Sequence, residues 1–172
     1  MKKKCIIALL SILTMATNYA CQEDDLEGII PTDPALIEKL YEHSADTLKI
    51  ASQQLTLETE LYRNFTPGIG PIKEKNRRLI APIWIVNTDS TVITQELTVS
   101  NLYVIHQHQI WTSEPGTNPE NSTPEYKSFF ISKDGPEWET GISVDVVIKI
   151  TDLTDNNEKY LIARNQMITK VQ

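Results

Sequence analysis

The sequence predicts an all-β, immunoglobulin-like β-sandwich of about seven strands, preceded by one short N-terminal helix. Apolar and polar residues alternate with a period of two over much of the chain after residue 47. Clusters of Gly, Pro, Asn and Asp separate these runs at modest spacing. A small open barrel stays as an alternative, because the cysteine and tyrosine hallmarks of antibody domains are absent.

The first elements are a helix and a hairpin. Asp33 and Pro34 supply an N-cap acceptor and a first-turn proline, and apolar residues at helical spacing follow, so we expect a helix over residues 34–44. From Thr47 the period changes to two, which predicts paired strands with Ser52-Gln53-Gln54 as their connection.

Residues 79–86 are apolar on both faces, which is typical of a central or covered strand. Pro82 within this run predicts either a break in the hydrogen-bond ladder or an edge position. A Pro- and Gly-dense loop over residues 63–71 precedes it. The further strands are expected at residues 97–111, in one or two pieces, and at residues 127–132, 142–150 and 159–168.

The N-terminus has the pattern of a secretory signal peptide over residues 1–20. Three lysines, Lys2 to Lys4, precede an apolar run of about a dozen residues, too short to span a membrane. Ala20 then leads into Cys21, and this junction resembles the lipobox of bacterial lipoproteins, although Asn18 and Tyr19 depart from the residues that the family prefers.

The acidic run Gln22-Glu23-Asp24-Asp25 looks like the signal that sends lipoproteins of the Bacteroidota to the outer face of the outer membrane. The resemblance to small surface lipoproteins of that group implies lipidation of Cys21, a lipid-anchored tether over residues 21–33 and a domain over residues 34–172. Secretion after cleavage at Ala20, with Cys21 as an ordinary thiol, is the alternative.

Charge and cysteine content exclude several functional classes. The chain has 16 Lys and Arg against 23 Asp and Glu, and loss of the signal peptide would leave 13 against 23, a net charge of −10. We therefore expect no nucleic-acid partner. The two cysteines are Cys5, within the signal, and Cys21, so we expect no disulfide, thiol chemistry or cofactor in the domain.

Candidate residues for chemistry are few. His106 and His108 on one strand would bring two imidazoles to one face, but two ligands without a third do not make a metal site, so we predict none. No nucleophile elbow, phosphate loop or dinucleotide motif is present, and Glu137 and Glu139 are interpreted as ordinary turn acids. We therefore predict no catalytic residues and no enzyme activity.

Three residues are candidates for ligand binding. Trp138 follows a Gly-Pro turn and lies between two glutamates, so we expect it to be exposed. Arg63 and Asn64 at a strand-to-loop junction offer a guanidinium and an amide for a carboxylate or a sugar hydroxyl. The structural alternative is that Phe65 plugs the end of the sandwich while Arg63 pairs with Glu60 or another acid.

These observations favour a tethered, non-catalytic surface domain that binds an extracellular partner or has a structural role in the envelope. Two alternatives remain. A glycan-capture role in polysaccharide uptake would need exposed aromatic rings aligned on one surface, and burial of Trp84, Trp111 and Trp138 together would exclude it. A role as an adhesin or fimbria-associated component is the other.

Overall fold

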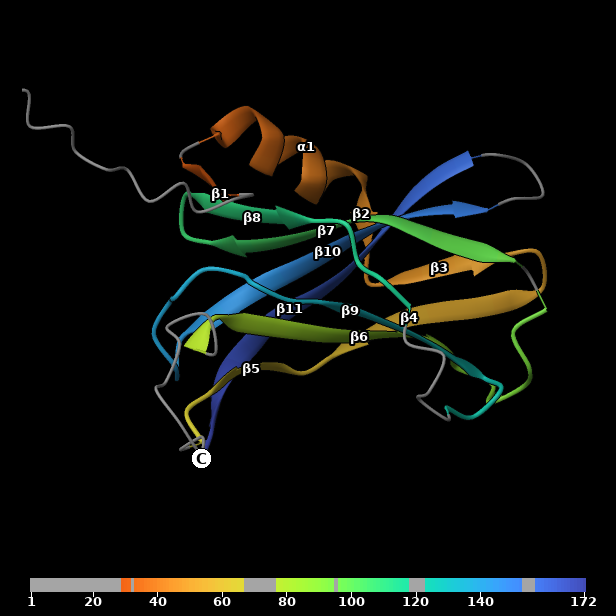
Figure 1. Cartoon of the computed structure of the whole chain (residues 1–172). Coiled ribbons are helices and arrows are strands. Elements are labelled where there is room, and N and C mark those ends of the chain that lie inside the picture. Colours follow the sequence, from red (N-terminus) through yellow and green to blue (C-terminus); the bar gives the residue numbers. More distant parts are fainter. Residues whose placement is uncertain (1–28, 32, 67–76, 95, 118–122, 153–156) are drawn as a thin grey trace, which may run out of the picture.

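The computed structural model describes residues 29–31, 33–66, 77–94, 96–117, 123–152 and 157–172. The predicted signal peptide and Cys21 lie outside the described residues, as do most of the tether and the core of the Pro- and Gly-dense loop. Two β-sheets pack face to face, and the helix lies on the outside of one of them (Figure 1).

The helix begins where the sequence predicts. It spans Pro34–His43 (α1), and the Asp33 carboxylate accepts a hydrogen bond of 2.9 Å from the Leu36 amide. This contact satisfies one of the amide groups that the first turn leaves without an intrahelical partner. The predicted N-cap is confirmed.

One sheet, here called sheet B, contains β3 (Thr47–Ile50), β4 (Gln53–Thr59), β6 (Leu79–Asn87) and β9 (Lys127–Ser132), all antiparallel in that order. The predicted first hairpin is confirmed, but its turn lies one residue earlier than expected, at Ala51 and Ser52. Ala51 adopts a φ of 51°, which lets β4 begin at Gln53.

The other sheet, sheet A, follows the order β1-β8-β7-β10-β11. Adjacent strands in it are antiparallel. The two residues of β2 (Ser44–Ala45) add a short parallel pairing to β11. The strand bounds are Ile29–Pro31 (β1), Gln109–Ser113 (β8), Leu97–His106 (β7), Ser143–Asp152 (β10) and Asn157–Val171 (β11).

The two sheets join at one edge through β5 (Leu61–Asn64). This strand pairs antiparallel with β6 and parallel with the last residues of β11. The long β11 changes partner near Asn165, whose φ is 56°, opposite an irregularity in β10 between Val144 and Val146. A bulge of this kind bends a strand, and here it accompanies the change of pairing from β10 to β5.

The predicted immunoglobulin-like sandwich with one short N-terminal helix is confirmed. In the described residues, seven strand positions form its two sheets: β4 with its continuation β5, then β6, β7, β8, β9, β10 and β11. The chain crosses between sheets after β6, after β8 and after β9, as in a Greek key. The short β1, β2 and β3 are additions at the periphery.

Pro82 lies in β6, which is a central strand between β4 and β9, so the edge interpretation was wrong and the break interpretation is confirmed. On the β9 side Pro82 stays in register with Ile131. On the other side the ladder stops at Thr59 and resumes at Tyr62, and the Pro82 carbonyl accepts from the Glu60 amide. The N–H group that proline lacks would therefore have pointed toward the place where β4 ends and β5 begins, so its absence removes no ladder hydrogen bond.

The main core fills the space between the sheets. Leu55, Ile83 and Ile85 of sheet B meet Leu102, Val146 and Ile148 of sheet A, and all six are fully buried. The strict alternation of residues 142–150 is explained by this packing, since the even-numbered residues from Val144 point inward.

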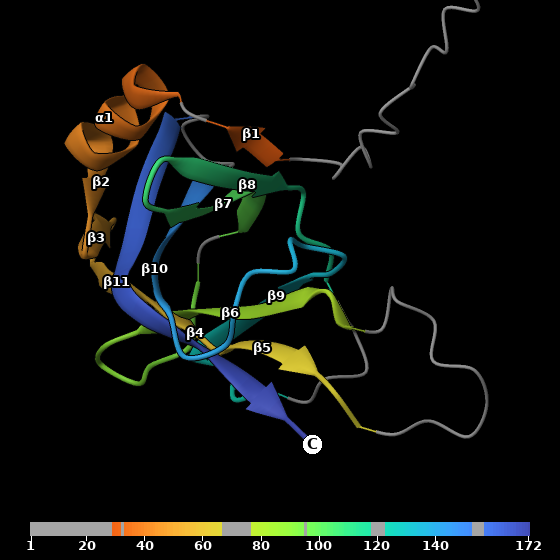
Figure 2. The same ribbon diagram turned by 90° about the vertical axis from the view of Figure 1, so that its left-hand side faces the viewer.

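Helix α1 lies against the outer face of sheet A (Figure 2), and a second apolar cluster fills the space between them. Leu40 packs with Ile105, Ile110, Val147 and Ile162. This cluster explains why Ile105 of β7 and Val147 of β10 are apolar although they lie on the face of sheet A that points away from the main core.

Tyr41 ties the helix to the bulge in β10. Its hydroxyl donates to Asp145 Oδ2 at 2.8 Å, and Asp145 Oδ1 accepts from the Asn165 amide at 2.8 Å. Burial and then this hydrogen bond raise the pKa of Tyr41 to about 12. One carboxylate therefore links α1, β10 and the turning point of β11.

In the described part of the chain no helix is long and apolar enough to cross a bilayer.

Candidate functional site

The candidate site is a cleft at one end of the sandwich, where the β7–β8 turn faces the loop of residues 133–142 that joins β9 to β10. The cleft has a volume of about 570 Å³, within the range of roughly 300 to 1,000 Å³ of ligand pockets. It is an open depression rather than an enclosed cavity. Its lining residues are His106, Gln107, His108, Gln109, Glu137, Trp138, Glu139 and Ile142.

Trp138 forms the apolar wall of the cleft. The sequence predicts an exposed side chain, but the indole is half-buried because it packs on the His106 ring with centroids 5.5 Å apart. Its Nε1–H donates to Gln109 Oε1 at 3.0 Å. The ring is therefore fixed by two residues that flank the β7–β8 turn, which loop position alone does not reveal.

His106 and His108 do not share a strand face, so the predicted arrangement was wrong. His106 is the last residue of β7, whereas Gln107, with a φ of 54°, and His108 form the turn before β8. Both imidazoles nevertheless line the cleft. Among the described residues no group of three or more His, Cys, Asp or Glu is placed to hold a metal ion.

Arg63 supports the cleft from behind. Its guanidinium donates to the Arg77 carbonyl at 2.5 Å, the Glu137 carbonyl at 3.0 Å and the Trp138 carbonyl at 2.8 Å. Its Nη2 also lies 3.7 Å from Glu137 Oε2, and the residue is only 8% exposed. These contacts favour the structural alternative for Arg63, with Glu137 rather than Glu60 as its acid.

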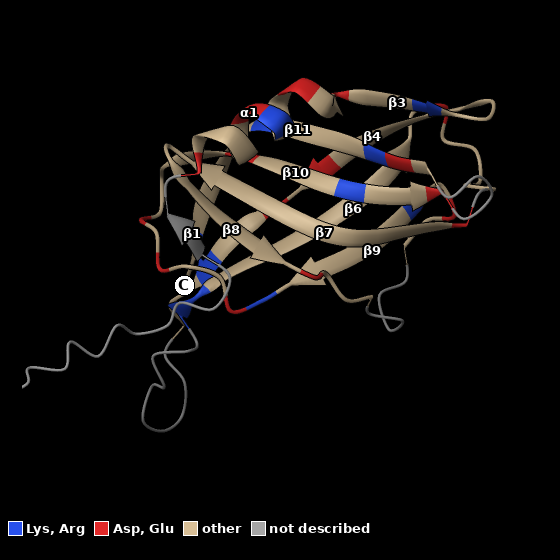
Figure 3. Ribbon diagram, turned by 90° about the horizontal axis from the view of Figure 1, so that it is seen from above, with Lys and Arg blue, Asp and Glu red and all other residues tan. Residues whose placement is uncertain are grey.

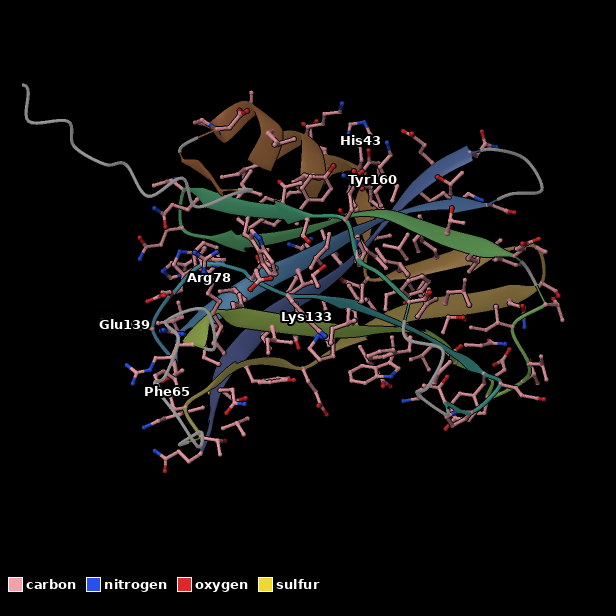
Figure 4. All side chains as sticks on the ribbon, in the orientation of Figure 1. His43, Phe65, Arg78, Lys133, Glu139 and Tyr160 are labelled. Atoms are coloured by element: carbon pink, nitrogen blue, oxygen red, sulfur yellow. The ribbon has the colours of Figure 1, made fainter. Side chains whose placement is uncertain are left out.

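Phe65 lies at the end of the sandwich that also carries Glu139 (Figure 4), and Asn64 stands between Arg63 and Phe65 in the chain. The Asn64 carboxamide accepts from the Thr66 amide at 2.9 Å, which stabilises the start of the loop. Arg63, Arg77 and Lys170 surround the Phe65 ring at 5.1 to 5.9 Å from its centroid. Ligand contact by Asn64 stays a prediction.

The other tryptophans lie elsewhere. Trp111 is buried in the core, where its ring approaches Gly135 so closely that a Cβ there would lie 2.8 Å away. Trp84 is half-buried on the outer face of sheet B, in a tilted pair with Phe129 at 5.3 Å. Because Trp84 and Trp138 keep partly exposed rings, the condition that would exclude glycan capture is not met, but the two rings lie on different surfaces.

Acidic and basic residues are distributed unevenly around the cleft. Within the described part of the chain, its lining contains Glu137 and Glu139 but neither lysine nor arginine. Basic segments gather instead beside the C-terminal end of the chain (Figure 3), in the neighbourhood of Phe65. Two other depressions are more polar, one along β3 and β4 beside Asp89 and one between Arg78 and Lys133.

Sequence reasoning missed Gln109 and Ile142 as members of the cleft. Gln109 begins β8 and Ile142 lies just before β10, whereas Trp138 lies in a loop. The pairing of strands therefore does not show that either residue lies beside Trp138. The signal that could have found Gln109 is the hairpin turn at Gln107 and His108, because the residue after such a turn lies beside the residue before it.

Comparison with protein-family models, with curated proteins and with solved structures gives no match for this chain.

Proposed function

We propose that this chain is a non-catalytic binding module, anchored to the outer membrane by lipid on Cys21, facing the cell exterior and taking an extracellular partner in the cleft around Trp138. The observation that carries the proposal is the convergence of two distant segments on one cleft. Trp138 and Glu139 come from the loop after β9, and His106 and Gln109 come from the β7–β8 hairpin.

The support behind the cleft favours binding. Arg63 fixes the backbone carbonyls of Glu137 and Trp138, and Gln109 fixes the indole nitrogen. A recognition residue that is already held in place loses little conformational entropy when its partner arrives. The cleft is therefore a preorganised surface rather than a mobile loop tip.

The anchor and the absence of catalysis rest on sequence. The Ala20–Cys21 junction and the acidic run that follows it support lipidation and display, and acyl chains supply the stable membrane attachment that such a module needs. No nucleophile elbow, phosphate loop or dinucleotide motif is present, so binding is the favoured role.

The test is to probe peptide and glycan arrays with the full chain and with Trp138→Ala. We expect ligands bound by the native chain to be lost in Trp138→Ala and kept in Trp84→Ala, whose indole lies on a different surface. Thermal unfolding of each variant shows that it is folded. Equal binding by the native chain and folded Trp138→Ala would reject the cleft as the site.

A second candidate is glycan capture on the outer face of sheet B. The Trp84–Phe129 pair favours it, because a partly exposed aromatic pair offers an apolar surface for a sugar ring, and the Glu58–Lys127 ion pair beside it offers polar groups for hydroxyls. On the same arrays this role predicts the opposite result, with glycan binding lost in Trp84→Ala and kept in Trp138→Ala.

A further inference from the structure

Among the residues that the structure describes, the carboxylates lining the cleft are those of Glu137 and Glu139, and no lysine or arginine lines it. Glu137 is partly neutralised, since its carboxylate lies 3.7 Å from Arg63 Nη2. Glu139 is exposed and has no ion pair among the residues that the structure describes. A ligand entering the cleft therefore meets an uncompensated negative charge at Glu139.

The indole of Trp138 offers the cleft its ring rather than its hydrogen-bond donor, because the Nε1–H already donates to Gln109. Tryptophan is the side chain whose ring attracts cations most strongly, through the negative potential of the ring face. A tryptophan without a free donor, next to an unpaired carboxylate, suits a cationic group.

His106 adds an acceptor to the cleft. Its Nδ1 lies 3.4 Å from the Ser143 carbonyl, and a carbonyl can only accept, so this contact requires the proton on Nδ1. In the neutral ring with this tautomer, the other nitrogen, Nε2, carries the lone pair. The cleft thus combines an acceptor nitrogen, a carboxylate and an aromatic ring, which together match a ligand that carries N–H donors and positive charge.

We propose that the ligand of this cleft is a guanidinium or alkylammonium group on a partner peptide, that is, an exposed arginine or lysine side chain. This inference rests on the proposed function, because it assigns a ligand class to the same cleft. A neutral sugar could also hydrogen-bond the carboxylate and pack on the ring, but it has no positive charge for Glu139 to attract. Its affinity should therefore depend less on the charge of Glu139 than the affinity of a cationic ligand does.

The experiment titrates the full chain with a blocked tetra-arginine peptide, a blocked tetra-serine peptide and a neutral oligosaccharide. The indole N–H resonance of Trp138, assigned by its loss in Trp138→Phe, reports binding at the cleft. We expect a saturable shift with the arginine peptide alone, and weaker binding as salt is added.

Glu139→Gln keeps the shape and the acceptor oxygen but removes the charge, and should weaken the arginine peptide by about tenfold or more. The matched control is Glu96→Gln, an exposed acid just before β7, roughly 30 Å of strand away from His106. It should bind like the native chain.

Equal affinity of the native chain and Glu139→Gln for the arginine peptide would overturn the inference, as would the absence of any shift with that peptide. If the serine peptide or the sugar shifts Trp138 instead, the cleft still binds a partner and only the ligand class is wrong. If array ligands bind equally to folded Trp138→Ala, the proposed function itself fails, whatever the arginine peptide does.

Discussion

Arg63 shows how one buried cation can organise a loop. It donates to three carbonyls, two of which belong to residues 74 and 75 positions later in the chain. Arg63→Ala should lower the free energy of unfolding by about 2 to 4 kcal/mol, because it removes a buried side chain and leaves three partly buried carbonyls without this donor. Urea unfolding measures this loss.

The control for Arg63 is Arg164→Ala, which removes a side chain that is 45% exposed and whose Nε lies 3.5 Å from Asp46 Oδ1. Exposed ion pairs contribute little, so its effect should stay below about 1 kcal/mol. Similar losses in both variants would contradict the assignment of Arg63 as a structural anchor.

The same residue marks the limit of prediction from sequence. That Arg63 lies at a strand end followed from the alternation of residues 55–61 and the Pro-rich run after it. Its acceptors did not follow, because sequence periodicity reports which way a side chain points but not which distant loop it meets. The position of Trp138 escaped prediction for the same reason, since its exposure depends on packing against His106, 32 positions earlier.

Tyr41 predicts a dependence of stability on alkaline pH. The pKa of its hydroxyl rises from 10.0 to about 12, chiefly through burial and then through the hydrogen bond to Asp145. The folded state therefore holds this proton more tightly than the unfolded state, so the contribution to stability is complete below pH 10 and declines as pH rises from 10 to 12. The measurement is the stability difference between the native chain and Tyr41→Phe across that range.

We expect the native chain to lose its advantage over Tyr41→Phe as pH approaches 12. Tyr103, Lys127 and Lys149 also have raised pKa values, chiefly through burial for Tyr103 and through hydrogen bonds to Glu58 and Glu158 for the two lysines. Because both proteins contain these groups, their effects largely cancel in this difference. A difference that stays constant from pH 9 to pH 12 would mean that the Tyr41–Asp145 contact does not form in solution.

At the scale of elements, the loop of residues 133–142 is held by close packing as well as by Arg63. A Cβ at Gly135 would lie 2.8 to 2.9 Å from three atoms of the buried Trp111 ring, too close without movement of the ring or the loop. Gly135→Ala should therefore lower the free energy of unfolding by about 1 to 3 kcal/mol.

Gly116→Ala is the matched control for Gly135→Ala. A Cβ at Gly116 meets nothing within 4 Å, and its φ lies outside the left-handed region, so the change should be near neutral. Because the loop carries Trp138, Gly135→Ala should also shift the Trp138 indole resonance, whereas Gly116→Ala should not. An unchanged resonance in a destabilised Gly135→Ala would show that loop packing and cleft geometry are independent.

Elements were predictable where one physical rule dominated. The helix followed from its cap and its apolar spacing, and β10 followed from strict alternation. The position of the strand that contains Pro82 was ambiguous, because proline lacks one N–H donor and the sequence does not show whether that donor would have faced a neighbouring strand or solvent. The His106–His108 prediction failed because the period-two pattern of β7 ends at His106, where the positive φ of Gln107 turns the chain.

At the scale of the whole molecule, the covering of the two sheet faces is unequal. Helix α1 covers the outer face of sheet A with an apolar cluster that includes Leu40 and Val147, while the outer face of sheet B carries the half-buried Trp84–Phe129 pair. The outer face of sheet A is therefore less accessible to a partner than the outer face of sheet B. Partner surfaces are to be sought on sheet B and at the cleft end, which are the two surfaces that the Trp84 and Trp138 variants separate.

Presentation of the domain at the cell surface depends on the predicted lipid anchor at Cys21. If Cys21 carries acyl chains, the native protein should sediment with the outer-membrane fraction and resist extraction at high salt or alkaline pH, because two or more chains give stable anchoring. Cys21→Ser should abolish this sedimentation without changing the fold, since the described residues pack without it. Mass spectrometry of the N-terminal peptide gives the direct measurement, and an unmodified Cys21 thiol on a cleaved chain would contradict the anchor while leaving the binding cleft open to test in a secreted protein.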